Sequence, residues 1–248
     1  MVLQEFKPHS HLSSYIDAYW DITGNAGAFS MDKVVPDGCI DIIINLGEAF
    51  HVSTVNEVLK SEKAYLAGAI THSMEGETFP GTRLVGIRFK PAAFSYFYSF
   101  ASLHDVTNRF IELDSHFIPE IRDLFDDIPS AFDFHLSRRL MQPKHFLLPV
   151  VNNIINRKGN VSIQNLASEH CTTIRQLERS FKYHVGLSPK EFVNIIRYKS
   201  AHDVIISQYP QKDLLEIALE FGYYDRAHLS NEVKKYAGVI PSALVKKV

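Results

Sequence analysis

The 248-residue chain is poor in cysteine and lacks any long apolar run. No stretch of about 18 apolar residues is present, and the start, MVLQEFKPHSHLSSY, lacks the basic-then-apolar order of a secretory signal. We therefore expect a cytoplasmic protein without a membrane partner. Cys39 and Cys171 fall in no CxxC or Cys/His spacing, which argues against a disulfide framework and a structural zinc site.

The common enzyme signatures are also missing. The sequence contains no GxSxG, Walker loop, dinucleotide fingerprint or HExxH. Its twelve histidines are scattered, and no metal-ligand spacing stands out around His51 or His72. We therefore expect no enzyme activity, no cofactor and no metal site in an otherwise ordinary globular composition.

The net charge of −2 hides a strong asymmetry between the two parts of the chain. Residues 145–248 carry fourteen Lys and Arg against nine Asp and Glu, about +5, whereas the remaining twelve against nineteen give about −7. This division is typical of a basic nucleic-acid-binding domain joined to an acidic sensing or assembly domain.

Residues 1–142 predict an α+β regulatory domain. Short apolar runs separated by Gly, Pro, Asn and Asp indicate a mostly β part over about 1–91, with clear strands over Cys39–Leu46 and Thr82–Phe89. Helical spacing then begins at Phe94, Phe97 and Tyr98, and the region 92–142 predicts further helices over Val106–Ile121 and Ile128–Leu140. Met141-Gln142-Pro143-Lys144 is the predicted boundary, since proline cannot continue the preceding helix.

Residues 145–248 predict an all-α domain that contains a repeated motif. Ser162 is a candidate N-cap of a short helix over Ile163–His170, and Thr173 with Gln176 forms a capping box for a second helix reaching about Val185. Gly186 is placed to end that helix in a left-handed conformation. The apolar positions predicted to face inward are Ile174, Leu177, Phe181 and Val185.

The same pattern recurs about fifty residues later. Asp213 with Glu216 predicts a second capping box, and Gly222 occupies the turn position of Cys171. The further matches, allowing one inserted residue, are Ile217-Ala218 with Leu166-Ala167, Leu229 with Leu177, Lys234 with Lys182, Gly238 with Gly186 and Pro241 with Pro189. Two copies of a short helix, a tight turn and a second helix with a polar face indicate two helix-turn-helix units.

Between the copies, a helix from Pro189 to about Ser207 predicts a rod roughly 27 Å long, at about 1.5 Å per residue. Such a rod can hold two recognition helices about one DNA turn, roughly 34 Å, apart, so that one monomer reads two successive major grooves. For base contacts we select Arg, Glu, Ser and Asn side chains on the polar faces: Arg175, Glu178, Arg179, Arg226, Ser230 and Asn231. The predicted phosphate contacts are Lys182, Lys190, Lys234 and Lys235.

These residues together resemble the DNA-binding domain of the AraC/XylS family of bacterial transcription regulators. The matching positions are Leu166-Ala167, Leu177-x-Arg179-x-Phe181-Lys182, Gly186-x-Ser188-Pro189, Arg197, Ala201, Ile217-Ala218, Gly222-Tyr223, Asp225 and Gly238 with Pro241. The resemblance implies double-stranded DNA as partner and, for an activator, RNA polymerase. Leu229 and Val233 stand where aromatic residues are common, and Ala227 replaces a frequent Ser.

The amino-terminal part is similar to the sensor domain of one subgroup of these regulators, through Tyr19-Trp20, Pro36-Asp37-Gly38-Cys39-x-Asp41 and Gly86-Ile87-Arg88-Phe89-x-Pro91. The resemblance implies a small β-barrel or cupin-like sheet with flanking helices, and control by a small-molecule effector or by homodimerisation. An effector pocket would use Trp20 as an aromatic wall and Asp41 and Arg88 as charges. Equally, Trp20 would be core, and Asp41 and Arg88 an internal ion pair.

Other functions stay open at this point. A DNA repair or adaptor protein could carry the same module, but such methyl-transfer proteins need a reactive Pro-Cys-type cysteine, which neither Cys39 nor Cys171 provides. A DNA-binding module without an effector, or a scaffold that uses its helix pairs only for protein contacts, remains an alternative.

Overall fold

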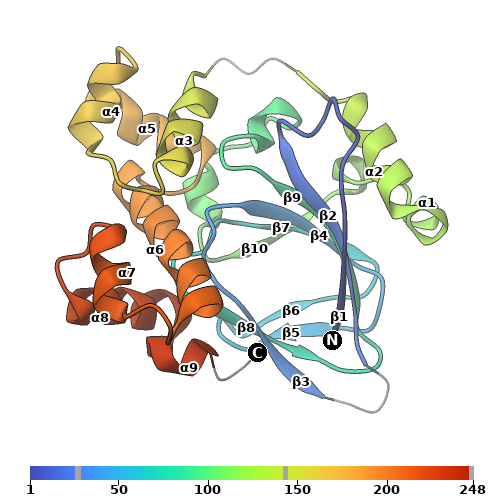
Figure 1. The fold of residues 1–248 in the computed structure, drawn as a ribbon. Helices are drawn as coiled ribbons and strands as arrows, with labels where there is room; N and C mark the ends of the chain where they lie inside the picture. Colours follow the sequence, from blue (N-terminus) through green and yellow to red (C-terminus); the bar gives the residue numbers. More distant parts are fainter. Residues whose placement is uncertain (26–28, 142–144, 246–248) are drawn as a thin grey trace.

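The computed structural model describes residues 1–25, 29–141 and 145–245, and its amino-terminal part is built on two antiparallel sheets (Figure 1). The six-stranded sheet has the order β1 (Val2–Phe6), β2 (Ile16–Thr23), β9 (Arg83–Phe89), β4 (Ile40–Asn45), β7 (Lys63–Ala67), β10 (Phe110–Leu113). The four-stranded sheet has the order β3 (Ser30–Val34), β8 (Met74–Thr78), β5 (Phe50–Val52), β6 (Glu57–Leu59). Strands β4 and β9 confirm the two clearest strand predictions.

Strand alternation divides the apolar residues of β4 between two cores. Ile40, Ile42 and Ile44 face the larger core, which also contains the helices. On the opposite face, Trp20 and Tyr65 of the larger sheet join a smaller cluster with side chains from the four-stranded sheet. The two sheets therefore pack face to face, and the predicted α+β class with a small β unit is confirmed.

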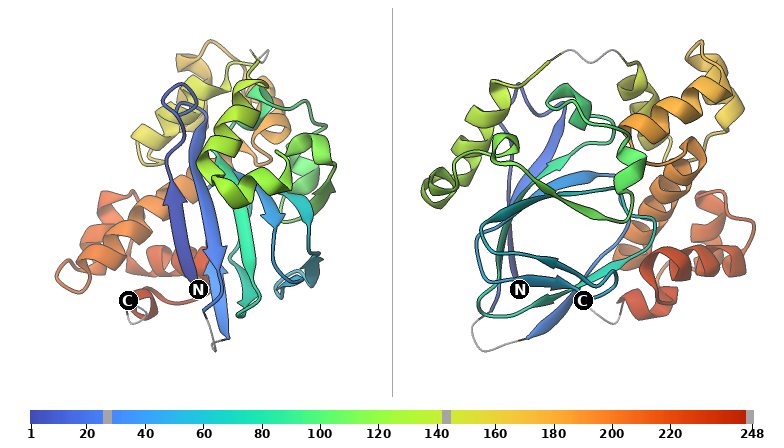
Figure 2. Two further views of the ribbon diagram at one scale, coloured as in Figure 1. Left: turned by 90° about the vertical axis from the view of Figure 1, so that its right-hand side faces the viewer. Right: turned by 180° about the vertical axis from the view of Figure 1, so that it is seen from behind.

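Short helices cover the larger sheet after β9 (Figure 2). These are the 3-10 segments η1 (Phe94–Tyr96), η2 (Leu103–Val106) and η3 (Ser115–Phe117), and the helices α1 (Ile121–Asp126) and α2 (Ile128–Ser137). The prediction of a helix from Ile128 is confirmed, and Asp127 caps it by accepting a hydrogen bond from the Ser130 amide at 3.2 Å.

The predicted helix over Val106–Ile121 is wrong. Asn108 adopts φ +60°, and its side chain bonds to Thr71, which interrupts any helix at that point. The following residues form β10, where Phe110 pairs opposite Ala67 and extends the larger sheet. The spacing of apolar residues around Phe110 is compatible with a helix or with a strand. The strand forms because pairing with the free edge of β7 supplies main-chain hydrogen bonds.

The remaining chain is helical: α3 (Leu147–Asn156), α4 (Ile163–Glu169), α5 (Ile174–His184), α6 (Pro189–Gln208), α7 (Leu214–Glu220), α8 (Arg226–Ala237) and α9 (Pro241–Val245). Helix α6 runs between α4–α5 and α7–α9, alongside the β part (Figures 1 and 2). The larger core continues from the six-stranded sheet through η2 into these helices. The predicted boundary at 142–144 lies outside the described residues.

Among the described residues, no helix is both long and apolar enough to cross a membrane. The same residues contain no group of three or more His, Cys, Asp or Glu side chains placed to hold a metal ion.

Candidate nucleic-acid interface

The first helix-turn-helix unit, residues 162–186, is positioned by the predicted caps. Ser162 accepts a hydrogen bond from the Asn165 amide at 3.1 Å and starts α4. Thr173 and Gln176 form the reciprocal capping box of α5, each side chain accepting from the other's amide at 3.1 Å. Between the helices, Cys171 adopts φ +49°, which turns the chain sharply.

Helix α5 buries one face and exposes the other. Leu177 and Phe181 are fully buried against the rest of the unit, as predicted. Ile174, in contrast, is 40% exposed, so its predicted inward position is wrong. It is the first residue of α5, and the helix meets its neighbours only from the next turn onward.

The polar face of α5 is free to meet a partner. Arg175, Glu178, Arg179 and Lys182 are all exposed, and none of their side chains makes an ion pair or hydrogen bond within the part of the chain that the structure describes. Unpaired charges on a convex helix can enter a major groove without first breaking an internal contact. The structure thus leaves the first unit's predicted reading residues accessible.

A cleft of about 780 Å³ flanks this face, between the start of α3, the turn before α5 and α5 itself. Its lining residues are His145, Phe146, His170, Cys171, Thr172, Gln176, Arg179, Ser180, Tyr183 and His184. Burial lowers the pKa of His184 to about 4, so this side chain is neutral near pH 7. Among the lining residues, Arg179 is the one Lys or Arg, and it carries a permanent positive charge.

The second unit, residues 213–238, repeats the architecture. Asp213 caps α7 through the Leu215 amide, and Asp225 caps α8 through the His228 amide at 2.7 Å. Gly222 adopts φ +72° at the position equivalent to Cys171, and Gly238 adopts φ +70° at the position equivalent to Gly186. Within the part of the chain that the structure describes, Glu216 makes no return bond to the Asp213 amide, so the predicted capping box is only half formed.

The polar face of α8 differs from that of α5 because some of its charged side chains contact neighbouring residues of the same chain. Arg226 lies 3.7 Å from Asp213, and Lys235 lies 3.2 Å from the Tyr236 hydroxyl and 3.8 Å from Glu232. Asn231 is exposed, whereas Ser230 is half-buried. Of the remaining predicted phosphate contacts, Lys190 on α6 and Lys234 on α8 are exposed.

Trp20, Asp41 and Arg88, proposed from the sequence as an effector site, do lie together. The Trp20 indole N–H donates to Asp41 Oδ1 at 2.8 Å, and Arg88 Nε lies 3.3 Å from the same oxygen. Asp37 lies 3.8 Å from Arg88, so one guanidinium faces two carboxylates. Burial raises the pKa of Asp41 to about 6 although Arg88 opposes the shift. The internal ion pair is thus present, and Trp20 belongs to the smaller core.

Gly86 makes the tryptophan's position possible. It pairs opposite Trp20 across β2 and β9, and a Cβ atom on Gly86 would lie 2.2 Å from the indole. Asp41 and Arg88 are also opposite each other, across β4 and β9. The three side chains therefore meet because adjacent strands place them in register.

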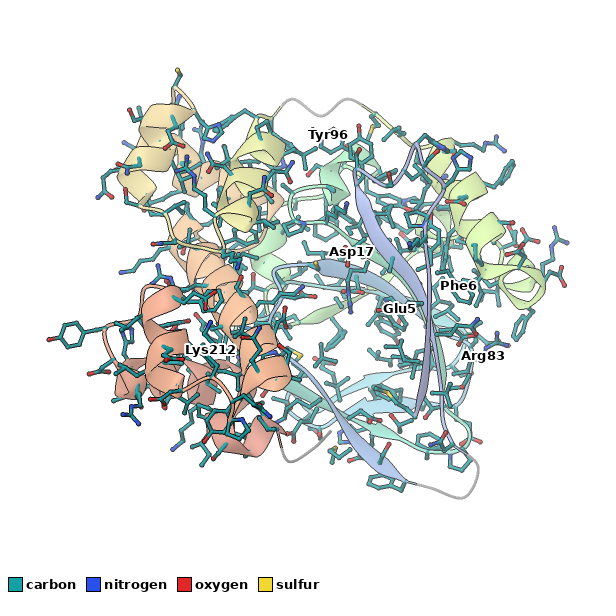
Figure 3. The ribbon with its side chains drawn as sticks, viewed as in Figure 1. Glu5, Phe6, Asp17, Arg83, Tyr96 and Lys212 are labelled. Atoms are coloured by element: carbon teal, nitrogen blue, oxygen red, sulfur yellow. The ribbon has the colours of Figure 1, made fainter. Side chains whose placement is uncertain are left out.

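The amino-terminal part contacts the carboxy-terminal ends of both recognition helices, which the sequence did not predict. His104 and Thr107, at η2, donate to the Gly186 carbonyl oxygen at 2.9 and 2.7 Å. Lys33 of β3 donates to the Ala237 carbonyl oxygen at 3.2 Å. Further contact occurs beside η1, where Tyr96, labelled in Figure 3, packs edge-on against the ring of His145.

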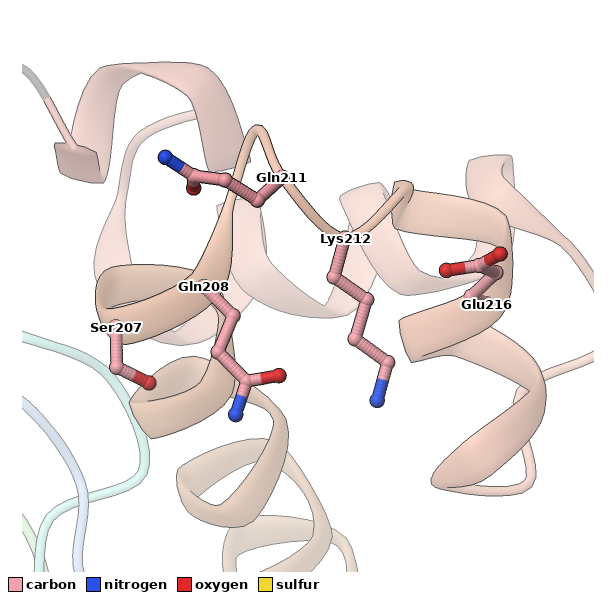
Figure 4. Close-up of a pocket in the computed structure, with 5 residues that line it drawn as sticks. All are labelled: Ser207, Gln208, Gln211, Lys212 and Glu216. Atoms are coloured by element: carbon pink, nitrogen blue, oxygen red, sulfur yellow. The ribbon is translucent and has the colours of Figure 1, made fainter.

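A pocket of about 410 Å³ lies where α6 ends and α7 begins (Figure 4). It is lined by Ser207, Gln208, Gln211, Lys212 and Glu216. Lys212 is already paired with Glu220 of α7. Among the described contacts, these five lining residues form no nucleophile–base pair with one another.

Two family models match the chain. One, described as a domain of unknown function (DUF6597), matches residues 4–112, and a helix-turn-helix domain matches residues 166–247. An uncharacterised HTH-type transcriptional regulator of Haemophilus influenzae is 34% identical over 108 residues, 44% of this chain and 36% of the relative. The aligned part of the chain therefore spans about a third of that relative's length.

Solved structures of ToxT from Vibrio cholerae have a similar fold. One covers 100% of this chain and 99% of its own with a TM-score of 0.53 at 10% identity. A second, bound to (E)-4-(8-methylnaphthalen-1-yl)but-3-enoic acid, covers 99% of each chain with a TM-score of 0.50 at 11% identity. At this identity the likeness concerns the fold alone.

Proposed function

We propose that the protein is a cytoplasmic, sequence-specific DNA-binding transcription regulator with no catalytic role, since its carboxy-terminal part matches a helix-turn-helix family model and carries motifs that resemble those of the AraC/XylS family. The observation that carries the proposal is the repeated unit: both copies place a capped second helix with an exposed polar face beyond a left-handed turn. A second helix so placed suits insertion into a major groove about 12 Å wide.

In this proposal the first unit supplies most of the sequence readout. Arg175 and Arg179 suit bidentate contacts to guanine, and Glu178 can accept from cytosine. Arg226, Ser230 and Asn231 make the corresponding contacts of the second unit, while Lys182, Lys190, Lys234 and Lys235 contact phosphates. Helix α6 has 20 residues, so its length of about 30 Å suits two successive grooves on one duplex face.

The amino-terminal domain, residues 1–142 in this proposal, controls the DNA-binding domain from 145 onward. Support comes from its contacts with Gly186, just after α5, and with Ala237, the last residue of α8. A change in the amino-terminal domain therefore reaches both reading helices directly. The signal is a small molecule bound beside Trp20, Asp41 and Arg88, or dimerisation through this domain; contact with RNA polymerase applies if the protein activates transcription.

Selection of duplexes from a random pool with the full chain tests the DNA-binding function. We expect enrichment of one sequence motif in two parts, which the protein prefers over a scrambled duplex by about a thousandfold. The matched control carries Arg175→Ala and Arg179→Ala together, which removes the guanine contacts without touching the buried face of α5. A protein that enriches no motif above the control would refute this function and leave a protein-contact scaffold.

The effector site has a built-in probe, because Trp20 is the only tryptophan of the chain. Its emission reports directly on the Asp41 carboxylate that accepts its N–H. Since burial raises the pKa of Asp41 to about 6, we expect the emission to titrate with a midpoint near pH 6, the ionised form prevailing above it. Asp41→Asn should abolish the titration, and a small molecule that binds here should shift the midpoint; emission that stays flat from pH 5 to 8 would contradict the assignment.

A further inference from the structure

Besides the connection through α6, the loop that precedes the first helix-turn-helix unit touches the second unit directly. The loop after α3, residues 157–160, which we call the junction loop, lies against the turn between α7 and α8. Lys158 Nζ is 5.3 Å from the centre of the Phe221 ring. A Cβ atom on Gly222 would be 3.5 Å from Asn160 Oδ1, an ordinary van der Waals distance. The junction loop therefore packs against the second unit's left-handed turn.

Arg197, in the middle of α6, binds both sides of this contact. Its Nε and Nη2 donate to the Gly159 carbonyl oxygen of the junction loop at 3.4 and 3.3 Å. Its guanidinium carbon lies 5.8 Å from the centre of the Tyr223 ring, which is buried at the start of the second unit's turn. One planar cation thus joins a main-chain oxygen of the first domain half to an aromatic face of the second.

Gly159 allows the junction loop to approach α6 this closely. It adopts φ +71°, and a Cβ atom there would lie 2.5 Å from the Val193 carbonyl oxygen and 2.6 Å from the Arg197 amide nitrogen. Both neighbours are helix backbone and cannot move aside without unwinding α6. Hence the loop's position on the rod is fixed by backbone packing before any side chain contributes.

We propose that Arg197 is a positioning residue that locks the two units at one separation, so that the protein accepts only one spacing between the two halves of its DNA site. The inference rests on the proposed DNA-binding function. Two binding heads on a stiff connection have a high effective concentration at one spacing and a low one elsewhere, whereas a loose connection lowers and broadens that maximum. A fixed separation of the two units therefore makes binding depend on the spacing of the half-sites, without any additional base contact.

The test uses the full chain and the best duplex from the random-pool selection, with one to five base pairs inserted between the two half-sites. About five inserted base pairs turn the second half-site to the opposite face of the duplex. For the wild-type protein we expect an affinity loss of about a hundredfold. The Arg197→Met variant should bind the uninterrupted duplex about tenfold more weakly than the wild-type protein does. Its affinity should then fall by only about a further threefold when base pairs are inserted.

Arg157→Met is the matched control. Arg157 belongs to the same junction loop, but its guanidinium pairs with Glu169 of α4 at 3.0 Å and so makes no ion pair with the second unit. This variant should keep the wild-type dependence on spacing. The inference is overturned if Arg197→Met also keeps it, or if the wild-type protein tolerates every insertion. Thermal melting checks that each variant is folded, and Tyr223→Leu replaces Arg197→Met if the latter is not.

A distance measurement separates this inference from the DNA-binding function. Nitroxides are attached through Glu178→Cys on α5 and Asn231→Cys on α8, with Cys39→Ser and Cys171→Asn as background. A narrow distance distribution that broadens on Arg197→Met, but not on Arg157→Met, supports locking even if no duplex binds. An unchanged width in Arg197→Met overturns locking even if the DNA-binding function stands.

Discussion

The two helix-turn-helix units share a backbone and differ in their free charge. Each has a left-handed residue in its turn, at Cys171 and Gly222, and a second one at the end of its recognition helix. On α5 the reading side chains make no internal contact among the described residues, whereas on α8 Arg226 and Lys235 are engaged with neighbours. Repetition of a fold therefore does not repeat its interface: we expect the first unit to discriminate between sequences and the second mainly to add affinity.

The largest expected effect tests whether the two units are equivalent in their cores. Leu177 and Leu229 are fully buried at matching positions. Replacing either by Ala removes the same atoms and leaves a comparable cavity, so each change should lower the free energy of unfolding by about 2–5 kcal/mol. Urea denaturation measures both; a loss below about 1 kcal/mol for only one of them would show that the units are not structurally equivalent.

The next effect concerns sequence readout. Arg179→Ala should weaken binding to the preferred duplex by about 1–3 kcal/mol and leave binding to random duplex nearly unchanged, because a base contact is lost. Asn231→Ala, on the exposed face of α8, should cost less on the same duplex. Equilibrium binding to the preferred and the random duplex measures the loss of affinity for each variant. If both variants lost the same binding free energy on the preferred duplex, the proposed difference between the units would be refuted.

Helix capping should contribute about equally in the two units. Thr173 and Asp225 each accept an amide hydrogen bond at the start of a recognition helix. Thr173→Ala and Asp225→Ala should each lower the free energy of unfolding by about 1 kcal/mol. Because Asp225 is also negative at a helix N-terminus, its loss should be the larger one at low salt. Denaturation at two salt concentrations checks this ordering, which would be refuted if the Thr173 variant were more sensitive to salt.

The smallest effect distinguishes a free lysine from an engaged one. Lys182→Ala should reduce the slope of log affinity against log salt by about 0.9, the value for one phosphate contact. Lys235→Ala should change the slope less, since its ammonium is held by Tyr236 and Glu232. Titrations between low and moderate salt give both slopes; a larger change for Lys235 would mean that its internal contacts are released on DNA.

What the sequence predicted well is what depends on neighbours in the chain. Caps at Ser162 and Thr173 and the left-handed glycines require particular residue types, so the helix ends could be located. The strands that bring Asp41 to Arg88 were also visible as apolar runs between turn residues. In each case a local physical requirement restricts the residue, and the restriction can be read without knowledge of the fold.

What it missed depends on partners distant in the chain. The segment around Phe110 became a strand because β7 offered a free edge, which spacing alone does not reveal. The hydrogen bonds from Arg197 to Gly159 likewise cannot be predicted from neighbouring residues, because the two residues lie far apart in the chain. The glycine after α3 was the only sequence feature that pointed to a close approach there. Whether the selected polar side chains contact DNA stays a prediction, since accessibility permits contact without proving it.

The amino-terminal part contacts the recognition helices and the residues that follow them through the main-chain oxygens of Gly186 and Ala237 and through the side chains of Tyr183 and His184. None of these groups is the side chain of a predicted DNA contact. Every residue keeps its carbonyl group when its side chain is exchanged. In the proposed regulator, the outer faces of α5 and α8 can therefore change without loss of these contacts, so that one amino-terminal domain can be combined with many reading surfaces.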